Sequence, residues 1–451
     1  MSGLPGLATN FQNRRHRLSN LKIKSIYCAL VLMLSLRAAA QTALTWEQVR
    51  ERFERNNPNL LAGALNIDES KAQEITAYLR PNPQFTLSSD GTQTIPTRKN
   101  PDGTSNPWQP LYATYIAGNF SYLHERQHKR ELRLESARKG TGIAVSSQAD
   151  LERTLLFNLR GSYVSVLQAE AVLRLAKDNL AYYDHVLDIS RIRFKDGDIA
   201  KIDLDRLELQ RVQYESDWQA AEVGLRTAKI ALLTLLNDRT SPDAFEVSGN
   251  LDFSEQLQPL DDFRKTALEN RPDLRAALQS VDKAKTDHQL AVANGSTDPT
   301  FSAWWTYNGS YNFSPGPVTD RHTLGLSVSV PLRIFDRNQG EKLRTQLDIT
   351  RNEKLRDAAE AQVFSDVDSA YATLNSNIVL LQPYRAKYLQ MSVSVRDTVT
   401  YAYQKGKASL LDFLNAESDY RAVQLAYINL LGAYMTSAAQ LNQAVGKEVM
   451  P

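Results

Sequence analysis

The sequence predicts a mainly α-helical protein with a small β part, in which four membrane-crossing strands are combined with long antiparallel coiled-coil helices. Three observations lead to this fold class: the chain is duplicated, four segments alternate between apolar and polar residues, and two stretches far longer than an ordinary helix carry few helix breakers. The 53 basic and 51 acidic residues nearly cancel, so the composition gives no indication of a nucleic-acid partner.

The duplication is clearest at two glycines about 210 residues apart. Gly197 and Gly406 each have an aromatic residue three positions before, an aspartate six positions after and a glutamate eleven positions after. Residues 57–60 likewise correspond to residues 271–274. A repeat of about 200 residues is far longer than the roughly 20 to 50 residues of a solenoid repeat. We therefore expect two copies, at residues 41–250 and 251–451, and an architecture with internal pseudo-symmetry.

The N-terminal segment predicts export. Basic residues between positions 14 and 24 precede an apolar run of 11 residues at 26–36, and Ala38 to Ala40 fits a small-residue cleavage site. A membrane anchor is the alternative, but the run is shorter than the roughly 20 residues that span a bilayer. We interpret residues 1–40 as a signal peptide cleaved near Ala40. The only cysteine, Cys28, lies within it, so the mature chain has no thiol chemistry.

Four segments have the pattern of strands that cross an outer membrane. They are residues 84–90 and 112–123 in the first copy and residues 299–313 and 322–332 in the second. Leu324, Leu326 and Val328, for example, alternate with small or polar residues. The connections at 91–110 and 314–317 are rich in Gly, Pro or Asn and predict loops. Two ordinary surface hairpins would give the same pattern, and this alternative stays open.

The rest of the chain predicts helices of unusual length. Residues 125–195 contain no proline, and a helix of about 70 residues would be on the order of 105 Å long. We expect a return at Gly197 into a helix at 200–236. The second copy predicts helices at 338–404 and 408–446, with a kink or break at Pro383. Apolar residues after each glycine follow the 4-3 spacing of a coiled coil at the same offset, which favours antiparallel pairing of the long helices.

The predicted strands cannot form a membrane domain within one chain. Four strands are too few to close a barrel, since the smallest single-chain barrels have about eight. An open sheet in lipid would leave the backbone groups of its edges unsatisfied. Several chains must therefore contribute strands to one barrel, which predicts a cyclic oligomer whose long helices surround the same axis.

The chain resembles the outer membrane efflux proteins of the TolC family. The resemblance is carried by the exported N-terminus, the duplicated strand and helix pairs, the segment 329–340 and the two aromatic-x-x-Gly turns, and it covers about residues 44–446. It implies a homotrimer in the outer membrane, with one barrel built by three chains and a long periplasmic tunnel. Such a channel is the passive exit duct of a tripartite efflux system. The implied partners are a periplasmic adaptor (membrane fusion protein), an inner-membrane pump of RND type and outer membrane lipid.

The resemblance also implies an aperture near the glycine turns. Asp412 matches a carboxylate that narrows the periplasmic opening, whereas Asn415 stands where TolC has a second aspartate, so the expected charge is halved. Asp203 and Tyr403 match positions that hold the closed aperture by hydrogen bonds between neighbouring helix pairs. The simpler interpretation makes Asp203 a helix-start residue and Tyr403 a packing residue.

The two turns themselves match the places where the periplasmic adaptor docks. Gly197 and Asp198 form the tip of the first turn, and Gly406 and Lys407 form the tip of the second. The tips carry opposite charges, so we expect two unlike docking sites. Ordinary solvated turn charges would look the same.

Two other classes of protein are open at this stage. A periplasmic coiled-coil structural or adaptor protein would also have long helices, but adaptors have one hairpin and a lipoyl-like region that this chain lacks. A zinc-dependent hydrolase is suggested by residues 124–128, His-Glu-Arg-Gln-His, which match the pattern H-E-x-x-H. That segment lies where a strand is expected to become a helix, beside Lys129 and Arg130. We therefore expect no enzymatic activity, no metal site and no cofactor. The sequence does not identify the cargo.

Overall fold

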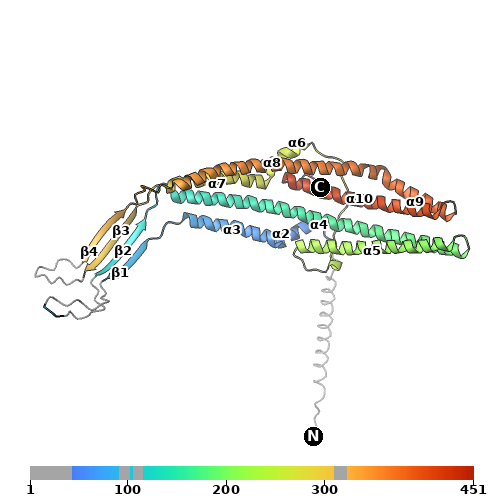
Figure 1. Ribbon diagram of the computed structural model, residues 1–451, viewed down its shortest axis with the longest axis horizontal. Helices are drawn as coiled ribbons and strands as arrows, with labels where there is room; N and C mark the ends of the chain where they lie inside the picture. Colours follow the sequence, from blue (N-terminus) through green and yellow to red (C-terminus); the bar gives the residue numbers. More distant parts are fainter. Residues whose placement is uncertain (1–42, 91–101, 105–114, 309–321, 451) are drawn as a thin grey trace, which may run out of the picture. The chain divides into compact units, whose positions relative to one another are not determined.

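The structure is a computed structural model that describes residues 43–90, 102–104, 115–308 and 322–450 (Figure 1). The predicted signal peptide lies outside these residues. So do most of the loop at 91–110, the whole of the loop at 314–317, and the predicted strand ends at 112–114 and 309–313.

The fold is mainly helical with one small antiparallel sheet, which is the predicted fold class. The helices are α2 (Trp46–Asn56), α3 (Pro58–Tyr78), α4 (Lys129–Lys195), α5 (Lys201–Leu235), α6 (Leu260–Asn270), α7 (Pro272–Asn294), α8 (Gln339–Pro383), α9 (Leu389–Gln404) and α10 (Leu410–Val445). A 3-10 helix, η1 (Pro242–Ala244), and a π-helix, η2 (Tyr384–Tyr388), complete them. No helix in the described ranges is long and apolar enough to cross a membrane.

The chain divides into two compact units, each with segments from both sequence copies. One unit comprises residues up to 57, 158–255 and 376–436, and we call it the turn unit because it contains both glycine turns. The other comprises residues 58–157, 256–375 and 437–451, and we call it the sheet unit. Helices α4, α8 and α10 each contribute residues to both units.

The sheet unit contains β1 (Gln84–Asp90), β2 (Tyr115–Leu123), β3 (Thr300–Asn308) and β4 (His322–Ser329), in the order β1-β2-β3-β4 with antiparallel neighbours. Residues directly opposite each other in antiparallel strands share a face. The register therefore aligns Phe85, Phe120, Ala303 and Leu326 in one row of one face. Rows on the other face are mostly polar, for example the one that runs from Gln84 through three serines. The sheet thus has one apolar and one polar face.

One close approach on the polar face requires a glycine. Trp304 lies opposite Gly325, and a Cβ atom at Gly325 would come within 2.2 Å of the indole ring. A side chain at position 325 would clash with the indole ring. Glycine, which has no Cβ atom, is therefore what allows the Trp304 side chain to lie across the backbone of β4.

The long helices begin and end close to the predicted residues, with one difference. Helix α4 has 67 residues and begins at Lys129 rather than near residue 125, because Gln127 and His128 have left-handed φ angles of 58° and 54° that no helix continues. The second long helix is interrupted after Pro383 by the π-helical turn η2, at the residue where a kink or break is predicted. Proline lacks an amide hydrogen, and a π turn is one way in which a helix absorbs the missing bond.

The duplication is visible in the backbone. Left-handed residues occur at matching positions of the two copies: His128 and Asn338, Gly197 and Gly406, and Asn237 and Gly446. The start of the short helices is matched as well. The Asn57 side chain donates to the Leu235 carbonyl at 2.9 Å in the turn unit, and its counterpart Arg271 donates to the Ala444 carbonyl at 3.2 Å in the sheet unit. Both contacts tie a helix start to the last turn of a long helix.

Candidate functional site

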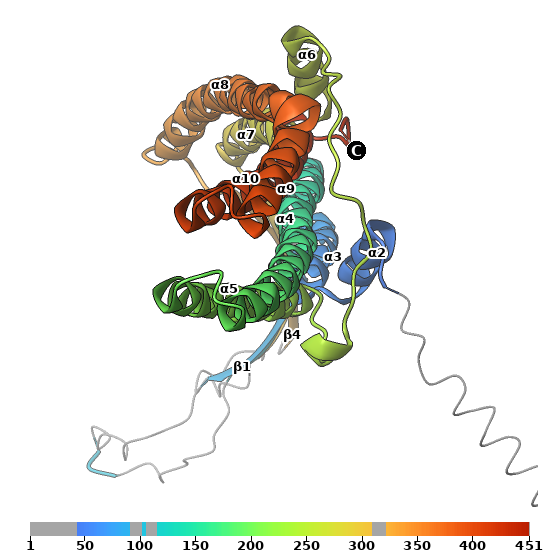
Figure 2. The same ribbon diagram turned by 90° about the vertical axis from the view of Figure 1, so that its right-hand side faces the viewer.

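The two glycine turns lie in the turn unit, where α4 leads into α5 and α9 into α10 (Figure 2). At both turns the amide after the glycine donates to the carbonyl four residues before the glycine, at 2.8 Å. Gly197 and Gly406 have φ angles of 82° and 68°, so both turns are glycine-capped helix ends of the Schellman type. A Cβ atom at either glycine would meet nothing within 4 Å. Asp198 and Lys407 are exposed beside them, so the tips are open to a partner.

Tyr403 does not point toward solvent beside its turn. Only 5% of the residue is exposed; its ring stacks on Phe413 at 5.0 Å between centroids, and the Arg193 guanidinium lies 5.3 Å from the ring centre. Burial raises the pKa of Tyr403. The hydroxyl is buried near Ser190 without a hydrogen bond of ordinary geometry. Packing within its own chain therefore holds the Tyr403 ring, while its hydroxyl lacks a well-formed hydrogen bond among the described residues.

Asp203 lies in the first turn of α5, where the helix dipole favours a carboxylate. Its amide donates to the Ala200 carbonyl at 3.0 Å, but its carboxylate accepts no hydrogen bond from the Tyr403 hydroxyl of the same chain. The sequence-based expectation placed this bond between neighbouring helix pairs. It stays a prediction about the assembled channel.

Asp412 is both an exposed carboxylate and part of a helix cap. The Ser409 amide donates to the Asp412 carboxylate at 3.1 Å, and the Asp412 amide donates to the Ser409 hydroxyl at 3.1 Å. This reciprocal pair is a capping box, and hydrogen bonds from the Ser409 hydroxyl and amide lower the pKa of Asp412. Asn415 lies three residues on along α10 and is also exposed, so the two side chains share one side of the helix. Ser409 was not singled out from the sequence, although its spacing to Asp412 is that of a cap.

Glu417 is a buried glutamate behind the second turn, and the sequence marks it only as a position of the repeat. Glu417 is 3% exposed, and one of its carboxylate oxygens has no hydrogen-bond partner in the described residues. Burial raises the pKa of Glu417 to about 7, although Arg396 and Arg421 oppose the shift. Its counterpart in the first copy, Glu208, is exposed and paired with Arg191 at 3.1 Å. Only the second copy therefore buries its glutamate.

Aromatic rings and guanidinium groups from four helices surround Glu417. The Arg421 guanidinium lies 4.4 Å from the centre of the Tyr214 ring and pairs with Asp217 at 3.0 Å. The Arg396 guanidinium lies 4.0 Å from the Tyr420 ring centre.

Stacked rings complete the surroundings of Glu417. Tyr183 stacks on Tyr214 at 4.3 Å, and Phe413 lies beside Tyr183. The Tyr182 hydroxyl donates to the Thr400 hydroxyl at 3.0 Å. This cluster joins α4, α5, α9 and α10 directly behind the turns.

The H-E-x-x-H segment has the wrong geometry for a zinc site. His128 has a left-handed backbone and precedes α4, and the His124 ring packs against Phe301 at 6.4 Å. Glu125 is paired with Arg133 at 2.9 Å. The two histidines therefore do not share a helix face, which a zincin requires. Across the described ranges, no three His, Cys, Asp or Glu side chains form a group that would hold a metal ion.

Comparison with known proteins gives the family. The sequence model of the family described as "Outer membrane efflux protein" matches residues 49–237 and again residues 264–447. The chain belongs to this family. The resemblance predicted from the sequence is thus confirmed, and the family consists of efflux channels rather than enzymes.

Relatives and solved structures agree with the family. The efflux protein is 24% identical over 416 residues to the cobalt-zinc-cadmium resistance protein CzcC of Cupriavidus metallidurans, with 90% of each chain covered. It is 21% identical to the outer membrane protein TolC of Escherichia coli over 88% of this chain and 81% of TolC. The crystal structure of CusC superimposes with a TM-score of 0.73 at 18% identity, covering 89% of this chain and 92% of CusC.

Proposed function

We propose that this efflux protein is the outer membrane channel of a tripartite efflux system. It is the passive exit duct that carries substrates from an inner-membrane pump and a periplasmic adaptor to the exterior, and it is gated at its periplasmic helix turns. The observation that carries the proposal is the joint presence of a sheet that one chain cannot close and two open helix turns, within a family of outer membrane efflux channels.

The sheet supports assembly as a homotrimer in the outer membrane. Its apolar face is uncovered, since Leu324 and Leu326 are 82% and 84% exposed in the single chain. Both β1 and β4 are edge strands of the described sheet. Lipid satisfies the apolar face but not the backbone of an open edge. Pairing β1 of one copy with β4 of the next closes the sheet around an axis, with the polar face turned toward the lumen.

The turn unit supports the gate. Tyr403 is fixed by Phe413 and Arg193, and its buried hydroxyl has no hydrogen-bond partner of good geometry among the described residues. Asp203 of a neighbouring copy is the acceptor predicted from the sequence, and the Tyr403 side chain has to turn out of its packing against Phe413 to reach it. Asp412 and Asn415 on α10 form the narrowing ring, with one carboxylate per copy.

The turn tips support docking of the adaptor. Gly197 and Asp198, and Gly406 and Lys407, present two exposed tips of opposite charge. A groove of about 590 Å³ lies between α5 and α10 in the same unit, lined in part by the exposed Leu209 and by Val212 and Leu414. Arg206, Gln210, Gln213 and Ser216 line the rest of the groove, so it offers both apolar and polar contacts to a partner that adds its own coiled-coil helices.

The cargo is proposed from a relative, and the type of pump from the family resemblance. CzcC is named as a cobalt-zinc-cadmium resistance protein. These divalent cations are therefore the first cargo to test, with a pump of RND type as the inner-membrane partner.

Single-channel conductance in planar bilayers tests the gate. The detergent-purified wild type should give small currents, and the double variant Asp203→Ala, Tyr403→Phe should give currents several-fold larger. A matched control makes the same two changes two residues away, in Asp205→Ala, Tyr401→Phe, and should behave like the wild type. Equal currents from the gate variant and the wild type would keep the channel and reject the gate. Absence of conductance from folded trimers would reject the channel.

A further inference from the structure

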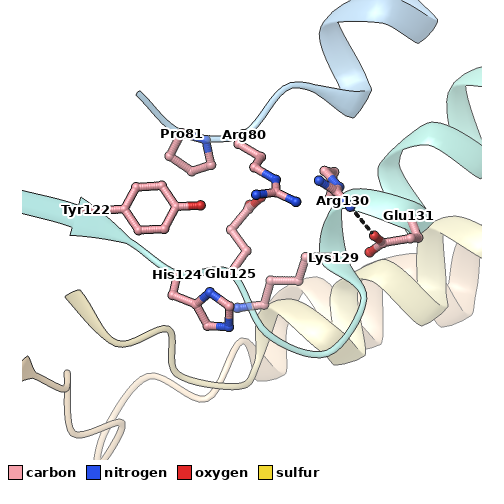
Figure 3. A pocket seen from close by; sticks show the side chains of 8 residues that line it. All are labelled: Arg80, Pro81, Tyr122, His124, Glu125, Lys129, Arg130 and Glu131. Atoms are coloured by element: carbon pink, nitrogen blue, oxygen red, sulfur yellow. Dashed lines mark hydrogen bonds and ion pairs between the residues drawn. The ribbon is translucent and has the colours of Figure 1, made fainter. Parts of the chain in front are cut away.

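A pocket of about 150 Å³ lies at the helical end of the sheet, where α3 leads into β1 and β2 leads into α4 (Figure 3). Its lining comes from the segment after α3, from the end of β2 and from the first turn of α4: Arg80, Pro81, Tyr122, His124, Glu125, Lys129, Arg130 and Glu131. All these residues belong to the sheet unit. None of these residues takes part in the proposed gate or in the proposed docking of the adaptor.

The pocket continues the apolar face of the sheet. Tyr122 is opposite Phe301, and Phe301 is opposite Val328 on the same face. His124 is two residues after Tyr122 and therefore lies toward the same face, with its ring 6.4 Å from that of Phe301. Where the apolar face contacts the acyl chains of a bilayer, this margin lies at the depth of the headgroups, the level at which tyrosine is enriched.

The acids around the pocket are already paired with bases. Glu125 binds Arg133 at 2.9 Å and Glu131 binds Arg130 at 2.8 Å, while Asp298 outside the pocket binds Lys129 at 2.6 Å. Arg80 makes no hydrogen bond or ion pair with any described residue and is exposed at the pocket. One positive charge is therefore left uncompensated.

Arg130 adds a second guanidinium beside the pocket. It lies 4.4 Å from the centre of the Tyr78 ring, and its Nε is buried without a hydrogen-bond partner in the described ranges, so this atom is closed to a ligand. Figure 3 shows Arg80, the Tyr122 hydroxyl and Arg130 directed toward the same space.

We propose that this pocket binds the phosphodiester headgroup of an anionic phospholipid in the leaflet next to the helices. Arg80 pairs with two oxygens of the phosphate through its guanidinium fork, and the Tyr122 hydroxyl is a further donor. The inference rests on the proposed membrane position of the sheet. A lipid rather than free phosphate is favoured because the pocket opens onto the apolar face, where Phe301 and Val328 receive the acyl chains. One site per chain would anchor the rim of the sheet.

Lipid binding to the full, detergent-purified protein tests the proposal. Native mass spectrometry measures retention of phosphatidylglycerol against phosphatidylcholine with the same acyl chains. The wild type should prefer phosphatidylglycerol by about tenfold, because both lipids offer the phosphodiester but the choline cation of phosphatidylcholine brings a positive charge next to Arg80. Arg80→Gln should abolish this preference, and Arg80→Lys should keep part of it. The control Arg138→Gln removes an arginine on α4 whose side chain is 66% exposed, and should change nothing.

The other outcomes overturn the proposal in recognisable ways. Equal retention of the two lipids by the wild type, or an unchanged preference in Arg80→Gln, would show that the pocket is not the site. Displacement of the lipid by a few millimolar inorganic phosphate would make it a site for a soluble anion instead. The conductance of the same preparation distinguishes failure of the lipid site from failure of the proposed function. A protein that conducts but shows no lipid preference would contradict the lipid site and leave the channel function standing.

Discussion

Glu417 shows how one buried residue makes the stability of the folded protein depend on pH. Its carboxyl is buried among aromatic rings, and the two nearby guanidinium groups, those of Arg396 and Arg421, do not fully offset the loss of hydration. The pKa is about 7 in the folded protein against an ordinary value of 4.5. Between these pH values the folded state binds more protons than the unfolded state, so stability falls as pH rises. The contribution is complete below about pH 4.5 and is lost as pH rises through 7.

The variant Glu417→Gln should therefore be more stable than the wild type at pH 8 and similar to it near pH 4.5. The difference at pH 8 is at most about 3 kcal/mol, from a pKa shift of about 2.5. Helical circular dichroism during heating, at pH values from about 4.5 to 8, measures the apparent melting temperature. The control Glu208→Gln changes the exposed counterpart and should leave the pH dependence of the wild type in place. A melting temperature of Glu417→Gln below that of the wild type at pH 8 would contradict the assigned environment.

At the scale of elements, the sequence predicts most of what depends on local patterns. The alternation of side chains in β4 by itself indicates a strand, so β4 was predictable. The glycines at 197 and 406 allow the left-handed backbone that ends a helix, so the two turns were predictable as well. The left-handed residues before α4 were not predicted, because Gln127 does not favour such angles and one histidine beside it is a weak signal. The burial of Glu417 depends on side chains from three other helices, and no spacing within one helix reveals it. The gate residues came from a resemblance and await a test on the trimer.

The glycines that end the helices should differ in how they tolerate alanine. Gly197 has a φ of 82° but open space around it, so Gly197→Ala costs only backbone strain, about 1–2 kcal/mol. Gly446 has a φ of 79°, and its Cβ would also lie 3.2 Å from the backbone of Asn270 and Arg271. Gly446→Ala should therefore lower the apparent melting temperature more than Gly197→Ala. Equal effects would mean that the neighbouring backbone moves freely.

At the scale of the whole molecule, the sheet decides how copies assemble, and neighbouring residues on its two faces give the sharpest test. Leu326 lies on the exposed apolar face of β4, and Ser327 lies on the polar face. An arginine facing lipid costs about 2–4 kcal/mol at the middle of a bilayer, whereas an arginine in a wet lumen keeps its hydration. Leu326→Arg should reduce the fraction of protein recovered as membrane-inserted trimer. Ser327→Arg, with the same added charge one residue away, should assemble like the wild type.

Detergent extraction of membranes followed by gel electrophoresis without heating measures that fraction for both variants. If Ser327 lines the lumen of a trimer, Ser327→Arg places three arginines there. The variant should then conduct cations less well than the wild type, although it assembles normally. If Ser327→Arg fails to assemble and Leu326→Arg succeeds, the two faces are assigned the wrong way round. If neither variant affects assembly, the sheet does not lie in the membrane. The pair therefore tests the orientation of the sheet on which the trimer, the lumen and the lipid site all depend.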